Sequence, residues 1–151
     1  MHLQQIILNI NNFHVTEDME DYEISEFFDA IGENLPDTST LTDLEKEHLI
    51  QSLFGFLKRQ DATLEEDFSF INVIEAIDKP DYKVYYPALI KFNSEYATLN
   101  STFLLNRFIN ALEGEEREKS LQVLKAIAVN TSYAESVRAH ALDFYKYQTE
   151  H

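Results

Sequence analysis

The side chains of this chain that could do chemistry are mostly carboxylates, and they gather in its first half. Residues 1–78 contain 18 Asp and Glu against three basic residues, Lys46, Lys58 and Arg59. Residues 79–151 contain nine of each sign, so the first half carries the whole formal net charge of −15. Crowded like charges destabilise a compact state and attract an oppositely charged partner. The pattern therefore predicts a binding surface for a basic partner, with an ordinary acidic surface as the alternative, and disfavours nucleic acid as a ligand because phosphates would be repelled.

Catalytic and metal-binding patterns are missing from the sequence. The five histidines, at positions 2, 14, 48, 140 and 151, include no two at metal-ligand spacing. The acidic run Glu17–Glu23 lacks the glycine of a calcium-binding loop, and there is no glycine-rich phosphate loop or nucleophile elbow. We therefore expect no catalytic residue, no metal site, no cofactor and no enzymatic activity. An all-α enzyme is a rival hypothesis that requires His48 or His140 in a pocket with converging carboxylates.

A tyrosine cluster is the second feature of interest. Tyr82, Tyr85 and Tyr86 lie between Pro80 and Pro87. Tyrosine offers a large, rigid contact area with a hydrogen-bonding tip, which is typical of protein interfaces. Packing over a helix junction explains the same cluster equally well, and the sequence leaves both interpretations open.

Length and composition predict one soluble globular domain over residues 1–151. Hydrophobic residues make up 44% of the 151 residues and aromatic residues 13%, which is too much for a disordered chain. Cysteine is absent, the N-terminus does not resemble a signal peptide, and no apolar run approaches the roughly 20 residues of a membrane span. We expect a cytoplasmic protein that does not bind membranes and is monomeric when free.

The elements that must position these side chains are predicted to be helices throughout. Gly and Pro are scarce, with three of each, and apolar residues recur at helical spacing. Thr-x-x-Glu or Ser-x-x-Glu capping boxes at Thr42, Thr63 and Ser132 predict three helix starts, and Gly114 is a predicted helix C-cap. The predicted helices cover residues 3–13, 18–33, 42–60, 63–77, 87–96, 102–112, 115–129 and 132–147, with loops at 36–40 and 78–87.

These seven or eight helices are expected to form antiparallel hairpins. Hairpins repeating at about 30–40 residues are typical of a short α-solenoid. We therefore predict an all-α fold with a short α-solenoid architecture, and a compact orthogonal helical bundle is the alternative.

Two segments of the second half resemble a known class of repeat protein. Ser136-Val137-Arg138-Ala139-His140-Ala141-Leu142 resembles the Val-Arg-x-x-Ala stretch on the second helix of HEAT-type repeats. Leu104–Asn110, followed by Leu121–Ile127, is similar to HEAT-like bacterial immunity proteins, of which the Immunity protein 30 family is the nearest. The likeness covers roughly residues 50–147. These proteins belong to polymorphic-toxin and contact-dependent growth inhibition systems.

The resemblance implies a non-enzymatic inhibitor that binds the C-terminal domain of a cognate toxin. Nuclease toxins need basic clefts to bind phosphate, so an acidic inhibitor suits a nuclease partner. We predict that the partner-binding residues are the carboxylates of the first half together with the tyrosine cluster: Glu17, Asp18, Glu20, Asp21, Glu23, Glu26, Asp29, Asp61, Glu65, Glu66, Tyr82, Tyr85 and Tyr86. Two further rivals are a nucleic-acid mimic that disarms a DNA-binding protein and a HEAT-like adaptor without inhibitory function.

Overall fold

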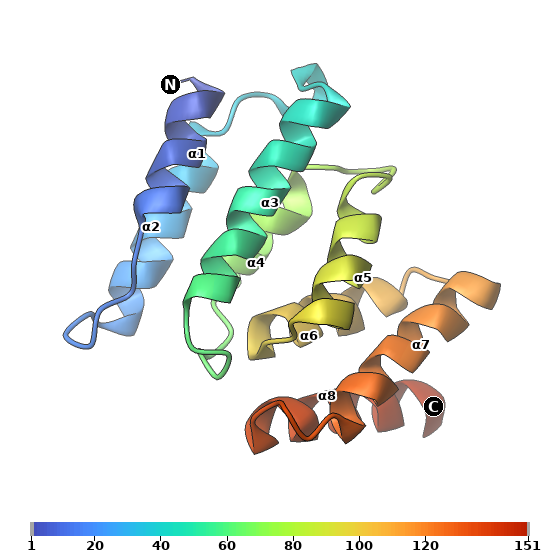
Figure 1. The fold of residues 1–151 in the computed structure, drawn as a ribbon. Coiled ribbons are helices and arrows are strands. Elements are labelled where there is room, and N and C mark those ends of the chain that lie inside the picture. The colour runs from blue at the N-terminus through green and yellow to red at the C-terminus, as the bar shows by residue number, and fades with distance from the viewer. Residues whose placement is uncertain (1, 151) are drawn as a thin grey trace. The chain divides into compact units, whose positions relative to one another are not determined.

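The structure is a computed structural model that describes residues 2–150 (Figure 1). Over this range it contains eight α-helices, one short 3₁₀ helix at Thr38–Thr40 and no strand, which confirms the prediction of an all-α fold with seven or eight helices. The helices are α1 (Leu3–Asn12), α2 (Asp21–Asn34), α3 (Asp43–Arg59), α4 (Phe68–Ala76), α5 (Tyr85–Glu95), α6 (Leu99–Ile109), α7 (Gly114–Val129) and α8 (Glu135–Glu150). Within this range, no helix is both long and apolar enough to cross a membrane.

Contacts along the chain group it into two compact units. Unit 1 comprises the described residues up to Gln60 together with Asp67–Ala88, and unit 2 comprises Asp61–Glu66 together with the described residues from Leu89 onward. The boundary between the two units falls inside α5. Unit 1 contains 16 acidic and five basic residues and unit 2 contains 11 and seven, so the charge asymmetry follows the units.

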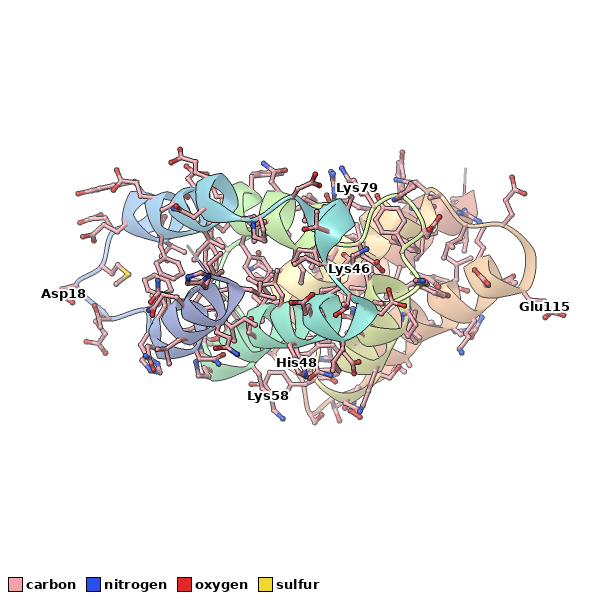
Figure 2. The ribbon with its side chains drawn as sticks, turned by 90° about the horizontal axis from the view of Figure 1, so that it is seen from above. Asp18, Lys46, His48, Lys58, Lys79 and Glu115 are labelled. Atoms are coloured by element: carbon pink, nitrogen blue, oxygen red, sulfur yellow. The ribbon has the colours of Figure 1, made fainter. Side chains whose placement is uncertain are left out.

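Unit 1 is a two-layer arrangement of helix pairs. Helix α1 packs beside α3 in one layer and α2 packs beside α4 in the other (Figures 1 and 2). Phenylalanine rings fill the space between the layers. Phe28 is fully buried at the centre of this cluster, with its ring centroid 4.9 Å from that of Phe56 and 5.1 Å from that of Phe70. Edge-to-face pairs at such distances stabilise a core beyond the burial of area alone.

Unit 2 is built around α8, which packs against both α6 and α7. Leu104, Leu124 and Val137, one from each helix, are fully buried. A partly buried polar network joins the same three helices, because the Arg117 guanidinium donates to both Gln148 Oε1 (3.0 Å) and the Ile109 carbonyl (3.0 Å). Full satisfaction of such groups fixes how the helices pack, since an unpaired buried polar group is costly.

One of the three predicted capping boxes is confirmed, and two are wrong. Thr42 Oγ1 accepts from Glu45 N (3.1 Å), and Glu45 Oε1 accepts from Thr42 N (2.8 Å), at the start of α3. Thr63 instead donates to Asp61 in a local turn, and α4 begins five residues later with Asp67 as its N-cap. Ser132 donates to Asn130, and α8 begins at Glu135. Short polar side chains satisfy turns as readily as helix ends, so the sequence signature does not distinguish them.

Two other boundaries also need correction. Gly114 is not a C-cap of α6, which ends at Ile109 with Asn110 as its C-cap; it is the first residue of α7, with φ +62°. Gly114 does adopt the left-handed conformation that glycine tolerates best, but it does so at the start of α7 and not at the end of α6. Helix α5 begins at Tyr85, two residues before the predicted start at Pro87, and the first turn of a helix tolerates this proline because its N–H groups are unbonded.

Candidate protein-binding surface

The densest run of negative charge lies on one loop and one helix of unit 1. Residues 13–34, which we call the acidic segment, contain eight Asp and Glu and no Lys or Arg. They form the loop between α1 and α2 and the whole of α2. Helix α2 buries Ile24, Phe28 and Ile31 and leaves its acidic side chains exposed. The amphipathic pattern that predicted this helix therefore also determines that its carboxylates face solvent.

The loop of the acidic segment is anchored by the end of α3. Arg59 Nη2 donates to the carbonyl oxygens of Ile10 (2.8 Å) and Phe13 (3.2 Å). The Phe13 ring stacks on Phe27 with centroids 3.8 Å apart and an interplanar angle of 4°. Asp18 lies at the tip of this loop (Figure 2). These contacts hold the start of a highly charged loop in a defined position, which lowers the ordering cost of binding.

Three predicted contact residues in this segment already have local partners. Glu23 Oε2 accepts a hydrogen bond from Glu20 N (2.7 Å) at the start of α2, so Glu20 and Glu23 stabilise the helix terminus. Thr16 Oγ1 donates to Asp18 Oδ1 (2.6 Å), and this hydrogen bond is the main cause that lowers the pKa of Asp18. Asp18 therefore stays ionised to lower pH than an isolated aspartate.

The remaining predicted carboxylates of the acidic segment are exposed. Glu17, Asp21, Glu26 and Asp29 all have exposed side chains, and none of the ion pairs found among residues 2–150 includes any of them. Asp21 is also the first residue of α2, where the helix dipole favours a negative charge. An oppositely charged partner can approach these four side chains directly.

The predicted residues Asp61, Glu65 and Glu66 belong to unit 2, so they are described apart from the acidic segment. The segment Asp61–Glu66 is attached to α6, because Leu99 N donates to the Ala62 carbonyl (2.9 Å). Glu66 Oε1 lies 2.7 Å from His140 Nε2, and both side chains are partly buried. Glu66 is thus an internal contact of unit 2, whereas Asp61 and Glu65 are exposed. Thr63 donates twice to Asp61, which lowers the pKa of that carboxyl.

One residue of the tyrosine cluster is buried in the core and the other two are partly exposed. Tyr85 is 1% exposed, so its ring belongs to the core and the prediction that it contacts a partner is corrected. Tyr82 and Tyr86 are half-buried. Tyr82 has φ +56°, which is unusual for a residue with a side chain, and burial with the nearby Glu75 and Asp78 carboxylates raises the pKa of its hydroxyl.

Asp78 explains why this segment turns where it does. Its side chain is 2% exposed and accepts from Val84 N (2.6 Å) and Tyr85 N (2.9 Å), the backbone groups at the start of α5. Lys46 Nζ lies 3.4 Å from the same carboxylate. A buried carboxylate with these partners fixes the chain between α4 and α5, and Lys46 neutralises its charge.

The sequence did not indicate a groove between α2 and α4 in unit 1. It has a volume of about 340 Å³, and its lining includes the apolar residues Phe28 and Val73, the small residues Gly32 and Ala76, and the carboxylates Asp29 and Glu33. Only Asp29 among them was predicted as a contact. Sequence periodicity assigns a residue to a helix face but does not show which two helices lie side by side, so it could not have found this groove.

Among the described residues, the histidines belong to no metal-binding cluster. His140 lies between Glu66 and Thr102, whose Oγ1 is 3.0 Å from His140 Nδ1, and its ring is 4.4 Å from that of Phe144. His48 is exposed on α3, and His151 lies outside the described residues. In the described part of the chain, no three His, Asp or Glu side chains are placed to hold a metal ion together.

Comparison of the chain with family models, curated proteins and solved structures gave no significant match. The resemblance to HEAT-like immunity proteins therefore depends on the sequence segments quoted above.

Proposed function

We propose that this chain is an immunity protein that binds and neutralises the basic domain of a cognate toxin, and we expect that domain to be a nuclease. The acidic segment is the principal contact surface. Its exposed, unpaired carboxylates carry the proposal: eight acidic residues follow one another without a Lys or Arg, and Glu17, Asp21, Glu26 and Asp29 have no internal cation among residues 2–150.

Three of the five basic residues of unit 1 are engaged elsewhere in the fold, which supports a partner from outside the chain. Lys46 pairs with Asp78, Lys83 pairs with Asp43 at 3.1 Å, and Arg59 donates to backbone carbonyls. None of these three reaches the exposed carboxylates of the acidic segment. Uncompensated like charge destabilises the folded chain. A basic partner would remove this repulsion on binding, which makes the surface more favourable in a complex than alone.

The shape of unit 1 is also suited to inhibition by occlusion. The acidic segment combines a loop anchored by Arg59 with a helix packed on a phenylalanine core. A nuclease cleft attracts phosphates through its basic lining. A prepositioned row of carboxylates competes for that lining and accelerates encounter by electrostatic steering.

The test is neutralisation of a toxin in cells. The C-terminal domain of the protein encoded by the neighbouring gene is expressed from an inducible promoter, with and without this chain. We expect the domain to stop growth alone and growth to be restored by co-expression. The matched control is this chain with Glu17, Asp21, Glu26 and Asp29 changed to Lys, which should restore growth poorly while folding normally by circular dichroism. Undiminished toxicity in the presence of the unaltered chain would refute the proposal.

A further inference from the structure

Small residues line the groove between α2 and α4 on both helices. Gly32 lies on α2 at the groove, and a Cβ atom built there would be 3.4 Å from Val73 Cγ2. Ala76 lines the same groove from α4. A longer side chain at Gly32 would occupy the space itself. Small residue types on both helices therefore leave this space unfilled.

The charge at the edge of this groove is uncompensated. Asp29 and Glu33 are four residues apart on α2, where side chains are neighbours on the helix surface. Both are exposed, and no ion pair found within residues 2–150 includes either of them. Two like charges at this spacing repel, so a cation placed between them is favoured.

Two exposed aromatic residues lie at the start of the same helix pair. Tyr22 is 61% exposed and precedes Asp29 by seven residues, which places the two on one face of α2. Phe68, the first residue of α4, is 62% exposed. Ser25 Oγ donates to Asp67 Oδ2 (2.8 Å), so the first turns of the two helices are adjacent. Exposed aromatic residues beside a groove are typical of the anchors of protein interfaces.

We propose that this groove binds an arginine side chain of the basic partner. The methylene stem would lie along the partly exposed Leu35 and Ala76, and the guanidinium would bind the carboxylates of Asp29 and Glu33. Arginine fits better than lysine because its planar group can donate to two carboxylates at once while its stem covers apolar surface. The proposal rests on the proposed function for the charge of the partner, and it adds the position of one anchor.

The probe is a short blocked peptide, acetyl-Gly-Arg-Gly-amide, titrated into the full chain and followed by NMR. A single arginine is expected to bind with a dissociation constant on the order of millimolar, which NMR measures well. We expect saturable shifts of the Gly32 and Ala76 backbone amides and of the Asn72 side-chain amide. The same peptide with citrulline, which has the shape of arginine without its charge, should bind at least about fivefold more weakly.

Two variants separate shape from charge. Gly32→Met fills the groove and keeps both carboxylates, and Asp29→Asn with Glu33→Gln keeps the shape and removes the charge. Each should weaken binding of the arginine peptide at least about fivefold. Glu115→Gln with Glu118→Gln, which removes two exposed carboxylates from α7, is the matched control and should change the affinity by less than about twofold. If Gly32→Met does not fold, the charge variant, which alters only exposed positions, decides the question.

Equal binding of the arginine and citrulline peptides would overturn the proposal. So would shifts spread over the acidic segment without saturation at Gly32 and Ala76, because that result indicates general charge attraction. The outcome is independent of the growth test. If the chain neutralises the toxin domain while the peptide avoids the groove, the anchor is wrong and the proposed function stands. If the peptide binds the groove and the toxin is not neutralised, the proposed function is wrong and the arginine site stands.

Discussion

Reversing exposed carboxylates of the acidic segment should slow association with the basic toxin domain in a salt-dependent way. The perturbation is Glu17→Lys with Glu26→Lys, which changes the charge of unit 1 by four units. Both side chains are exposed, and they lie outside the hydrogen bond between Glu20 N and Glu23 and outside the groove carboxylates Asp29 and Glu33. Folding should be unaffected, since surface changes typically shift stability by about 0.5 kcal/mol or less each.

The magnitude follows from Coulomb's law and screening. One pair of unit charges about 15 Å apart in water, as at the encounter stage, interacts with roughly 0.3 kcal/mol. Four units then amount to about 1.1 kcal/mol for each positive charge on the partner, and at about 0.01 M salt roughly 60% of this survives screening. The energy that remains corresponds to an association rate about threefold lower for a partner with one positive charge, or about tenfold lower for a cleft with two net positive charges. At about 0.15 M salt only about 15% survives, and the effect falls below about twofold.

The assay is stopped-flow association with the toxin domain across a salt series. The matched control is Glu115→Lys with Glu118→Lys, the same change of charge on α7 of unit 2. We expect the control to slow association at low salt by less than about twofold. Equal effects from the two variants would show that only total charge matters. No effect from either would refute the acidic segment as the steering surface and favour the half-buried tyrosines, Tyr82 and Tyr86.

Three further predictions concern stability and titration. Phe28→Ala should lower the free energy of unfolding in urea by about 3–5 kcal/mol, because it empties the centre of the phenylalanine cluster; a loss below about 1 kcal/mol would contradict that packing. Gly114→Ala should cost about 1 kcal/mol at φ +62° through backbone strain alone, since nothing lies within 4 Å of the added Cβ; an unchanged urea midpoint would refute this. Thr16→Val should raise the lowered pKa of Asp18 toward its ordinary value in an NMR titration. Because the folded-state pKa of Asp18 is depressed, its hydrogen bond stabilises the fold above the ordinary pKa of 3.8, and this contribution is lost as the pH falls through the lowered value; the variant should lack this acid-side dependence.

The sequence by itself determined the helical class and the charge distribution. Apolar residues at helical spacing assigned Ile24, Phe28 and Ile31 to one face of α2, and all three are buried. The exposure of the carboxylates on its other faces follows from the same pattern, because ionised groups remain in water unless they are paired. Local chemistry was sufficient at the start of α3, where Thr42 and Glu45 form the expected reciprocal hydrogen bonds.

Local chemistry was insufficient where a distant segment competes for the same side chain. Glu66 was expected to complete a capping box with Thr63, yet it contacts His140, 74 positions later in the chain. Tyr85 was a candidate contact residue, yet the chain turn held by Asp78 places it in the core. Both outcomes depend on which segments meet in space, and helical periodicity carries no information about that.

The groove at Asp29 and Glu33 is the clearest case of a feature decided by tertiary structure. Its two walls come from helices separated by the whole of α3, and the small residues Gly32 and Ala76 line it from the two sides. The sequence places carboxylates on the surface of α2 because hydration makes burial of a charge costly. Only the packing of α4 beside α2 places two of them at the edge of a groove, because the groove needs the surfaces of both helices and these meet only in the folded chain.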